Sequence, residues 1–553
     1  MQTNRLRIGI LLDCYTVPAW VFSCLERVAG LSSADIVLVV LRQSPSPKET
    51  TASGIWRGRR TLLYRFFNRI DTALLGRHAD AMAPADLSKL LSDIPTVRVT
   101  PRSTTQTDSF SAEDVSAINR ENLDIIIKFG FKMLCGDILT AARFGIWTYR
   151  HGDNVPGESA PPGFWEAVEK RPETNCTLQM LRQSPHADST VYRLSLFTYP
   201  FSPARNRNYL LWASSALLAR QIDILHSLGE ERFLARVRGF SEPLWTYDGP
   251  KYTIPSNLKT VAAVIRLAAR LVQELYRRLV FEDCWHLLYE LNDTSKLAPI
   301  GLKQLVPPEG AFWADPHVIY RDGRYFVFIE EYLHRTGKGH ISVIEMDEQG
   351  RSTRPLPVLQ ADYHLSYPFL IEWEGRYYMV PESSEHGTVD LYECMEFPAV
   401  WRYRLTLMAN VKAVDATLIH HQGMWWLFAG LVDNWAAFPQ VELFLFFSDS
   451  LFATDWQPHP MNPVVSDVKR ARPAGRIVER GGKLYRPSQD CSRNYGYGFD
   501  LNEILVLSTT DYVEERRCSV RPNWDRQVLG CHTFATTGKL AMIDAFKRRR
   551  RIF

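Results

Sequence analysis

Acidic residues recur at fixed steps from a repeated glycine in the second half of this chain. Asp315, Tyr367 and Asp415 each lie eight residues before such a glycine, and Glu330 and Glu382 each lie seven residues after one. Equivalent steps of a repeat face equivalent directions, so several carboxylates are expected to converge. Cleavage of a glycosidic bond requires that arrangement: one acid protonates the leaving oxygen, and one carboxylate activates water or attacks the sugar.

The repeated glycines lie in short turns spaced about 50 residues apart. Each turn joins an apolar strand to an aromatic strand, as at 316–320 and 325–329. Self-similarity of this kind in an all-β segment is typical of propeller blades. Five turns therefore predict an all-β, five-bladed β-propeller, with residues 285–289 as the early strand that closes the ring. The turn glycines are Gly323, Gly375, Gly423, Gly482 and Gly538.

Short motifs in this half resemble those of two groups of carbohydrate-active proteins. They are similar to the five-bladed furanosidase fold of family 43 glycoside hydrolases, and more similar still to the β-propeller domain of glucosamine inositolphosphorylceramide transferases. The resemblance covers roughly residues 280–550. The motifs that carry it are FWADPH (312–317), PE (381–382), VDAT (414–417), GCHTF (530–534) and IDAF (543–546).

The resemblance implies roles for individual residues. By position, Asp315 would be the general base or nucleophile and Glu382 the general acid, while Asp415 would tune a pKa or stabilise the transition state. Alternatively, these acids only bond turn backbones, or the domain binds sugar without cleaving it, since catalysis in the transferases is attributed to a separate domain. Arg472, Arg476 and Arg486 either bind a charged sugar or form ordinary ion pairs. The residues expected to contact carbohydrate are Trp313, Glu330, Tyr367, Arg472 and His532.

A second candidate site lies near residue 150. The segments GIWTYRHGDNVP (145–156) and GFWEA (163–167) resemble the catalytic N-terminal domain of formyltransferases, including methionyl-tRNA formyltransferase. In that family a strand ends in Asn-x-His and a proline follows five residues later. His151 and Pro156 keep this spacing, and the match covers roughly residues 5–200.

The formyltransferase resemblance implies its chemistry only in part. Formyl transfer from 10-formyltetrahydrofolate uses an amide donor, an imidazolium and a carboxylate. His151 is kept, but Tyr149 replaces the asparagine and His186 stands where the aspartate belongs. A nearby carboxylate would have to take the place of the aspartate, or the pocket serves another transfer, such as one from a nucleotide-sugar donor. The alternative is that His151 is a buried histidine hydrogen-bonded at a strand end. The candidate catalytic residues are His151 and Asp153, and the candidate substrate-binding residues are Tyr149, Asn154 and Asp188.

The first 200 or so residues alternate apolar strands with helical segments, which predicts an α/β domain with a Rossmann-type parallel sheet covered on both faces. We expect this domain over 1–204, a helical linker over 205–280 and the propeller over 281–553. The predicted strands are 7–12, 35–41, 123–129, 177–181 and 190–196, and the predicted helices are 22–29 and 113–121.

Composition is that of a globular protein. Of 553 residues, 46% are hydrophobic, 12% aromatic and 23% charged, and the net charge of +4 is too small to indicate a nucleic-acid partner. The nine cysteines form no C-x-x-C pair, and no Cys/His cluster has metal-ligand spacing. The sequence contains no apolar run long enough to span a bilayer and no cleavage site after the first apolar run. These features favour reduced thiols in a cytoplasmic protein.

Two segments, 56–75 and 261–280, combine arginines with an apolar stripe, and a basic run at 547–551 is expected to be a solvated tail. Cationic amphipathic helices either dock on anionic membranes or pack on their own protein. The predicted function is a transferase of cell-surface glycan or glycolipid assembly that acts on an activated or lipid-linked sugar. The alternatives are a glycoside hydrolase or transglycosidase using the propeller carboxylates, and a non-catalytic glycan-binding protein.

Overall fold

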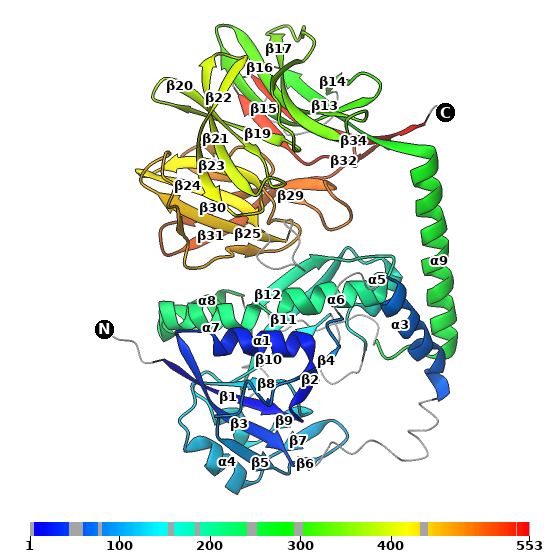
Figure 1. The fold of residues 1–553 in the computed structure, drawn as a ribbon, viewed down its shortest axis with the longest axis vertical. Coiled ribbons are helices and arrows are strands. Elements are labelled where there is room, and N and C mark those ends of the chain that lie inside the picture. The colour runs from blue at the N-terminus through cyan, green and yellow to red at the C-terminus, as the bar shows by residue number, and fades with distance from the viewer. Residues whose placement is uncertain are drawn as a thin grey trace. The chain divides into compact units, whose positions relative to one another are not determined.

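The computed structural model describes residues 5–43, 59–75, 80–152, 160–182, 189–240, 252–291, 302–431, 441–537 and 539–551 (Figure 1). The chain divides into two compact units, unit 1 over Met1–Val272 and unit 2 over Gln273–Phe553. The division falls inside a long helix, α9 (Asn257–Val280). Each unit is described below by itself.

Unit 1 is built on a seven-stranded sheet with the order β12-β11-β10-β8-β1-β3-β5. Five strands run parallel, because apolar runs buried on both faces suit a sheet covered by helices. The two strands at one edge, β11 and β12, are antiparallel, so the sheet is mixed and not wholly parallel as predicted. The stretch between β11 and β12 is too short for a crossover, which forces the reversal. The strands are β1 (Leu6–Leu12), β3 (Ala34–Arg42), β5 (Thr96–Val99), β8 (Ile125–Lys128), β10 (Ile146–His151), β11 (Glu173–Leu181) and β12 (Ser189–Phe197).

Helices cover this sheet, and the two predicted in this region are present as α1 and α4. Helix α4 begins where the Ser111 hydroxyl accepts from the Asp114 backbone N–H at 3.1 Å, a capping box. Helices α6 and α7 bury most of their residues in unit 1, so the segment predicted as a linker is in part core. The helices are α1 (Ala19–Ala29), α3 (Leu62–Leu75), α4 (Ala112–Asn119), the 3-10 turn η1 (Asp137–Thr140), α5 (Phe164–Glu169), α6 (Pro203–Ser214), α7 (Leu217–Leu228) and α8 (Glu230–Phe240). Short strands β2 (Thr16–Pro18), β4 (Pro84–Asp86), β6 (Arg102–Ser103), β7 (Thr107–Ser109) and β9 (Met133–Cys135) complete the unit.

The described part of unit 2 after α9 is all β and forms five antiparallel sheets. The first combines β13 (Phe281–Leu291) and β14 (Lys303–Leu305) with β32 (Val528–Gly530), β33 (Phe534–Thr537) and β34 (Leu540–Arg550). The second is β15 (Ala311–Arg321), β16 (Arg324–Leu333), β17 (Lys338–Asp347) and β18 (Leu356–Leu359), and the third is β19 (Ser366–Trp373), β20 (Arg376–Glu382), β21 (Thr388–Glu396) and β22 (Val400–Ala409). The fourth is β23 (Ala413–His421), β24 (Met424–Leu431), β25 (Glu442–Ser448), β26 (Gln457–Pro458) and β27 (Val465–Ser466), and the fifth is β28 (Val478–Arg480), β29 (Lys483–Asp490), β30 (Gly498–Leu507) and β31 (Tyr512–Val520).

Four of the repeated glycines occupy tight hairpins, and the fifth, Gly538, lies outside the described residues. Asp322-Gly323, Glu374-Gly375 and Gln422-Gly423 each form a two-residue loop in which both residues have positive φ, between 51° and 78°. Such turns match the twist of the strands they join, and glycine adopts this conformation without steric cost. The turn repeat read from the sequence is therefore a repeat of hairpins.

The first and last strands of unit 2 pair with each other. Strand β13 runs antiparallel to β34 from Phe281 opposite Arg550 to Leu291 opposite Leu540, and it contains the predicted early strand. The basic run expected as a solvated tail therefore lies mostly in a sheet. Within it Arg549 pairs with Glu282 at 2.6 Å.

Candidate functional site

Three strands of unit 2 share an unusual backbone at equivalent positions. Asp315, Tyr367 and Asp415 have φ of 51°, 43° and 52°, in the left-handed region, where such side chains are strained. The pairing register shifts at each of these positions, which marks a β-bulge. The residue before the first bulge pairs with Glu330, and the residue before the second pairs with Glu382. The spacing found in the sequence thus brings these acids to the same level of neighbouring hairpins.

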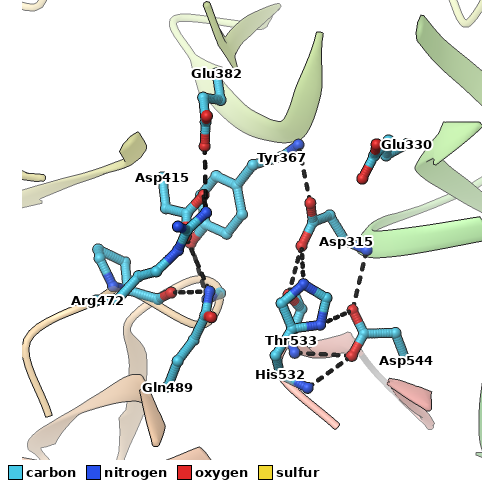
Figure 2. Close-up of polar contacts among 12 residues, drawn as sticks. Asp315, Glu330, Tyr367, Glu382, Asp415, Arg472, Gln489, His532, Thr533 and Asp544 are labelled. Carbon is cyan, nitrogen blue, oxygen red and sulfur yellow. Dashed lines mark hydrogen bonds and ion pairs between the residues drawn. The ribbon is translucent and has the colours of Figure 1, made fainter. Parts of the chain in front are cut away.

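Asp315 is held by a buried group from the first sheet, which contains β33 and β34 (Figure 2). Its Oδ1 accepts from the Thr533 hydroxyl at 2.7 Å and lies 3.3 Å from His532 Nε2. The other imidazole nitrogen, Nδ1, lies 2.7 Å from Asp544 Oδ2. Asp544 also accepts the backbone N–H groups of His532, Thr533 and Asp315 at 2.8, 3.0 and 3.1 Å. The group is an Asp–His–Asp chain locked to the backbone.

Burial and mutual charge set the protonation of this chain. Burial raises the pKa of Asp315 to about 6, against the opposing effect of His532. Burial alone would lower the pKa of His532, but Asp544 and Asp315 outweigh it and raise that pKa. The pKa of Asp544 is lowered, because His532 and three N–H donors outweigh its burial. Near neutral pH, Asp544 is therefore the fixed anion, and Asp315 is close to its ionisation point.

Asp415 belongs to a second group, built around Arg472 (Figure 2). Arg472 Nε lies 2.5 Å from Asp415 Oδ2, and its Nη2 lies 3.1 Å from Asp415 Oδ1 and 3.5 Å from Glu382 Oε2. Gln489 Nε2 donates to Asp415 Oδ2 at 2.9 Å. Burial, opposed by Arg472 and reinforced by Glu382, raises the pKa of Asp415 to about 7. Figure 2 shows this group on one side and the Asp315 group on the other, both from equivalent bulges.

Glu330 is the acid of the cluster that most favours its protonated form. Its pKa is raised well above the usual range by burial first, and then by the negative charges of Asp315 and Glu382. His364 Nε2 lies 3.4 Å from Glu330 Oε1. Glu382, the general acid implied by the resemblance, instead accepts from the Ser384 hydroxyl at 3.0 Å and faces Arg472. The raised pKa makes Glu330 a further candidate for the proton donor.

The aromatic residues expected to contact carbohydrate lie in the interior. Tyr367 has no exposed surface; its hydroxyl pairs with Thr417 Oγ1 and accepts the Gly475 N–H, both at 2.8 Å. Trp313 lies in a core cluster, and its indole N–H donates to Glu331 Oε1 at 3.2 Å. Both side chains position neighbouring strands and offer no open face for stacking.

The three arginines singled out in the sequence have partners inside the unit. Arg472 pairs with Asp415, Arg486 pairs with Glu514 at 2.7 Å, and Arg476 donates to the Leu370 carbonyl. The two expected roles were binding of a charged sugar and ordinary ion pairing. Arg486 has the second role, because it pairs with Glu514. Arg472 is different, because its carboxylate partners are the candidate site itself.

Sequence analysis missed Asp544, Thr533 and Gln489 as members of the cluster. A signal for Gln489 was present, because it lies seven residues after Gly482, the step that gives Glu330 and Glu382. A search for acids alone passes over an amide. Asp544 is the one charged residue of the run LAMIDAF (540–546), and an acid in a buried apolar strand requires partners.

Asp315, His532 and Asp544 could also hold a metal ion, since each offers a ligand atom and these atoms lie within 4.8 Å of one another. Two carboxylates and an imidazole suit several divalent cations. Each ring nitrogen of His532 faces one of the two carboxylates. A metal ion bound there would have to replace the proton on the nitrogen that it binds. In the observed geometry the two carboxylates and the imidazole form a chain of ion pairs.

The second candidate site lies at the end of β10 in unit 1. His151 has a buried Nε2 without a hydrogen-bond partner among the described residues, and burial lowers the pKa of His151 to about 4. Its ring stacks on Tyr149 at 5.6 Å and meets the edge of Trp20 at 5.1 Å. The Tyr149 hydroxyl donates to the Ser214 carbonyl at 2.9 Å and accepts the Leu218 N–H at 3.1 Å, so it ties the sheet to α6 and α7. Asp153, Asn154 and Asp188 lie outside the described residues.

Charged residues not singled out in the sequence gather at the same carboxyl edge of the sheet. Arg42, which ends β3, is buried and lies 2.8 Å from Asp13 and 2.5 Å from Asp108. Lys128 ends β8, and burial lowers its pKa. Strand β1 lies between β3 and β8, where the strand order reverses, and ligands of open α/β sheets bind outside the carboxyl ends of strands at such a point.

Unit 2 is therefore an all-β domain that gathers acids from successive hairpins at one interior place. Within it, residues 304–527 match the sequence model of the family "Glucosamine inositolphosphorylceramide transferase 1, N-terminal". The transferase of that name from Arabidopsis thaliana is 34% identical over 206 residues, which is 37% of this chain and 27% of the relative. The chain thus spans about a quarter of the length of that relative. The predicted resemblance to these transferases is confirmed for this segment.

Solved structures give more distant likenesses. The catalytic domain of an α-L-arabinofuranosidase of family 62 from Coprinopsis cinerea is 12% identical and covers 46% of this chain and 94% of its own, with a TM-score of 0.33. A phosphoribosylglycinamide formyltransferase from Anaplasma phagocytophilum is 14% identical and covers 40% and 88%, with a TM-score of 0.26. The formyltransferase resemblance of unit 1 stays a prediction.

Proposed function

We propose that this chain is a glycan transferase of glycolipid or cell-surface polysaccharide assembly. Its five antiparallel sheets would be the blades of a five-bladed propeller, closed by the pairing of β13 with β34. The sugar, activated or lipid-linked, would bind at the acids of the two bulges. The sequence match to transferases whose name specifies a glycosylated inositolphosphorylceramide supports a glycolipid acceptor of that class.

One observation carries this proposal: buried acids in different protonation states share one site. Burial and neighbouring carboxylates raise the pKa of Glu330 well above its usual range, while the pKa of Asp544 is lowered and burial raises those of Asp315 and Asp415 to about 6 and about 7. Transfer from a glycosidic donor passes through a cation-like transition state that carboxylates stabilise. Its leaving oxygen accepts a proton from an acid, and the same residue then takes the proton of the acceptor hydroxyl. Glu330 fits the acid, and Asp315 fits the carboxylate.

The same chemistry supports a second candidate, a glycoside hydrolase or transglycosidase. A proton donor and a carboxylate suffice for hydrolysis if water replaces the sugar acceptor. The two functions differ in product, because hydrolysis releases a free sugar and transfer does not. A glycan-binding protein without catalysis is the third reading, and it predicts binding that survives loss of Glu330.

For unit 1 we propose a formyltransferase-like domain whose pocket opens at the carboxyl edge of the sheet. The neutral His151, whose Nε2 has no partner within the described part of the chain, supports a role in which it accepts a proton or bonds a donor molecule. The donor would be 10-formyltetrahydrofolate or a nucleotide-sugar. The cytoplasm is the proposed compartment, and the nine free thiols support it.

The test is a transfer assay on the full chain with radiolabelled nucleotide-sugars and an inositolphosphorylceramide acceptor. We expect Asp315→Asn and Glu330→Gln to lower product formation by a factor on the order of 100 or more. Asp390→Asn is the matched control: Asp390 is a buried acid held by Thr388 and Thr406, outside the cluster. Unchanged transfer in both cluster variants would exclude catalysis there, and free sugar as the product would favour the hydrolase.

A further inference from the structure

Two helices of unit 1 turn large apolar side chains outward. On α3, Phe66 is 65% exposed and Leu74 is 74% exposed. On α9, Leu258, Ile265 and Val272 are 84%, 62% and 66% exposed. A single exposed leucine is ordinary, but an exposed row along each of two helices marks an interaction site.

The opposite sides of both helices are firmly docked. Tyr64 and Phe67 of α3 pack in one cluster with Ala263 and Leu267 of α9, over Phe164. The Asn257 side chain joins the starts of the two helices: its Oδ1 accepts the Leu63 N–H at 3.1 Å, and its Nδ2 donates to the Arg59 carbonyl at 2.9 Å.

A further anchor lies along α9, where Arg270 donates to the carbonyls of Ala167 at 2.8 Å and Val168 at 3.1 Å. These bonds cap the end of α5. The exposed rows therefore belong to helices that already have a fixed place on the unit.

The exposed charged side chains on α3 and on the part of α9 in unit 1 are all positive. The only acid of α3 is Asp71, which is buried and accepts the Ala204 N–H at 2.7 Å, and the part of α9 in unit 1 contains no acid. Arg65, Arg69 and Arg266 are exposed, as is Lys259 of α9. A second copy of this face would oppose cation to cation, whereas an anionic lipid surface offers both the apolar interior and the negative headgroups.

We propose that α3 and the first two-thirds of α9 dock unit 1 on an anionic lipid bilayer, lying in its interface. None of the described helices is long and apolar enough to cross a membrane, so the docking is peripheral and reversible. The inference is independent of the proposed reaction, because it rests on the outer faces of two helices that contain none of the candidate catalytic residues. If the acceptor is lipid-linked, docking also brings the enzyme to the surface that holds it.

The experiment is co-sedimentation of the full chain with vesicles of phosphatidylcholine, with or without about one-third phosphatidylserine. We expect sedimentation only with the anionic vesicles, and release by high salt. The double variant Phe66→Ser/Ile265→Asn should weaken partitioning on the order of tenfold or more, because two apolar anchors are lost. Arg65→Gln/Arg69→Gln/Arg266→Gln should reduce the preference for anionic vesicles.

The matched control is Met82→Gln/Met133→Gln, two apolar residues of unit 1 that are 46% and 45% exposed and belong to neither helix. It should bind vesicles as the parent chain does. Circular dichroism of every variant checks that the fold is intact. A parent chain that stays in the supernatant overturns the proposal, as does an apolar variant that sediments fully. A dimer in solution that the apolar variant dissociates, without vesicle binding by the parent, assigns the face to a second copy instead.

Discussion

Asp315 and Asp415 have the same backbone conformation, φ of 51° and 52°, at bulges in β15 and β23, yet their carboxylates face different partners. Asp315 meets a histidine that a second aspartate holds, and Asp415 meets a guanidinium. One strained position is thus used twice to carry a carboxylate into the interior. Strain that recurs at a buried polar cluster is typical of functional sites.

The strain gives a first prediction, made with glycine. Glu374 has φ of 51° in an exposed hairpin, so Glu374→Gly should raise the free energy of unfolding by roughly 0.5–1 kcal/mol. Asp415→Gly relieves the same strain but leaves Arg472 buried without its main counter-ion, and should lower the free energy by about 3 kcal/mol or more. Urea denaturation of both variants measures the difference. Stabilisation by both changes would mean that the Asp415 ion pair contributes nothing.

A second prediction concerns pH. The pKa of Asp315 is raised from 3.8 to about 6 in the folded state, so its contribution to stability is full below about pH 4 and is lost as the pH rises through 6. Relative to Asp315→Asn, the parent chain should therefore lose about 3 kcal/mol of unfolding free energy between pH 4 and pH 7. His286 and His317, whose pKa values burial lowers to about 4 and about 3, act in the opposite sense but are present in both proteins. A difference that does not change with pH would contradict the raised pKa.

The third prediction tests the hold of Asp544 on His532. The pKa of His532 is raised because the attraction of Asp544 and Asp315 outweighs burial. In Asp544→Asn the larger attraction is gone, so the pKa of His532 should fall. Titration of histidine-labelled protein by NMR follows the ring directly. The exposed His386 gives the reference signal, which should be the same in both proteins.

The fourth prediction is a double-mutant cycle on Arg472 and Asp415. Arg472→Met should lower the free energy of unfolding by about 3–5 kcal/mol, because it leaves the buried carboxylate of Asp415 without its cation. Adding Asp415→Asn should recover a large part of that loss, since the uncompensated charge is removed. Arg486→Met with Glu514→Gln is the matched cycle on a buried pair outside the cluster. Both cycles should show coupling in stability, and only the first should change sugar binding.

The sequence was sufficient to place the acids of unit 2 at the same level. The hairpin glycines lie in two-residue turns of the same geometry. A position eight residues before or seven residues after such a glycine therefore falls at an equivalent place along the strand in each sheet. This is why Asp315 and Asp415 share a conformation. It is also why Glu330 and Glu382 each lie opposite the residue that precedes a bulge in the neighbouring strand.

Other parts of the site could not be read this way. Asp544 and Thr533 come from the first sheet, in which two short strands, β32 and β33, pair with β34 and the β32 pairing shifts in register, so a fixed step does not reach them. Protonation was also hidden, because it depends on burial and on charges brought together from distant segments. In unit 1 the apolar runs predicted strands correctly, but an apolar run has no direction, and the antiparallel pair β11 and β12 followed only from the short stretch between them.

The pairing of β13 with β34 has a consequence for synthesis. Some 250 residues separate the two strands, so a chain emerging from the ribosome exposes β13 without β34 until that distant strand has been made. During that interval the edge of β13 is open to pairing with other nascent strands. Loss of β34 would leave that edge unpaired permanently, so a chain that lacks residues 540–550 should be cleared by proteases although every acid of its bulges is intact.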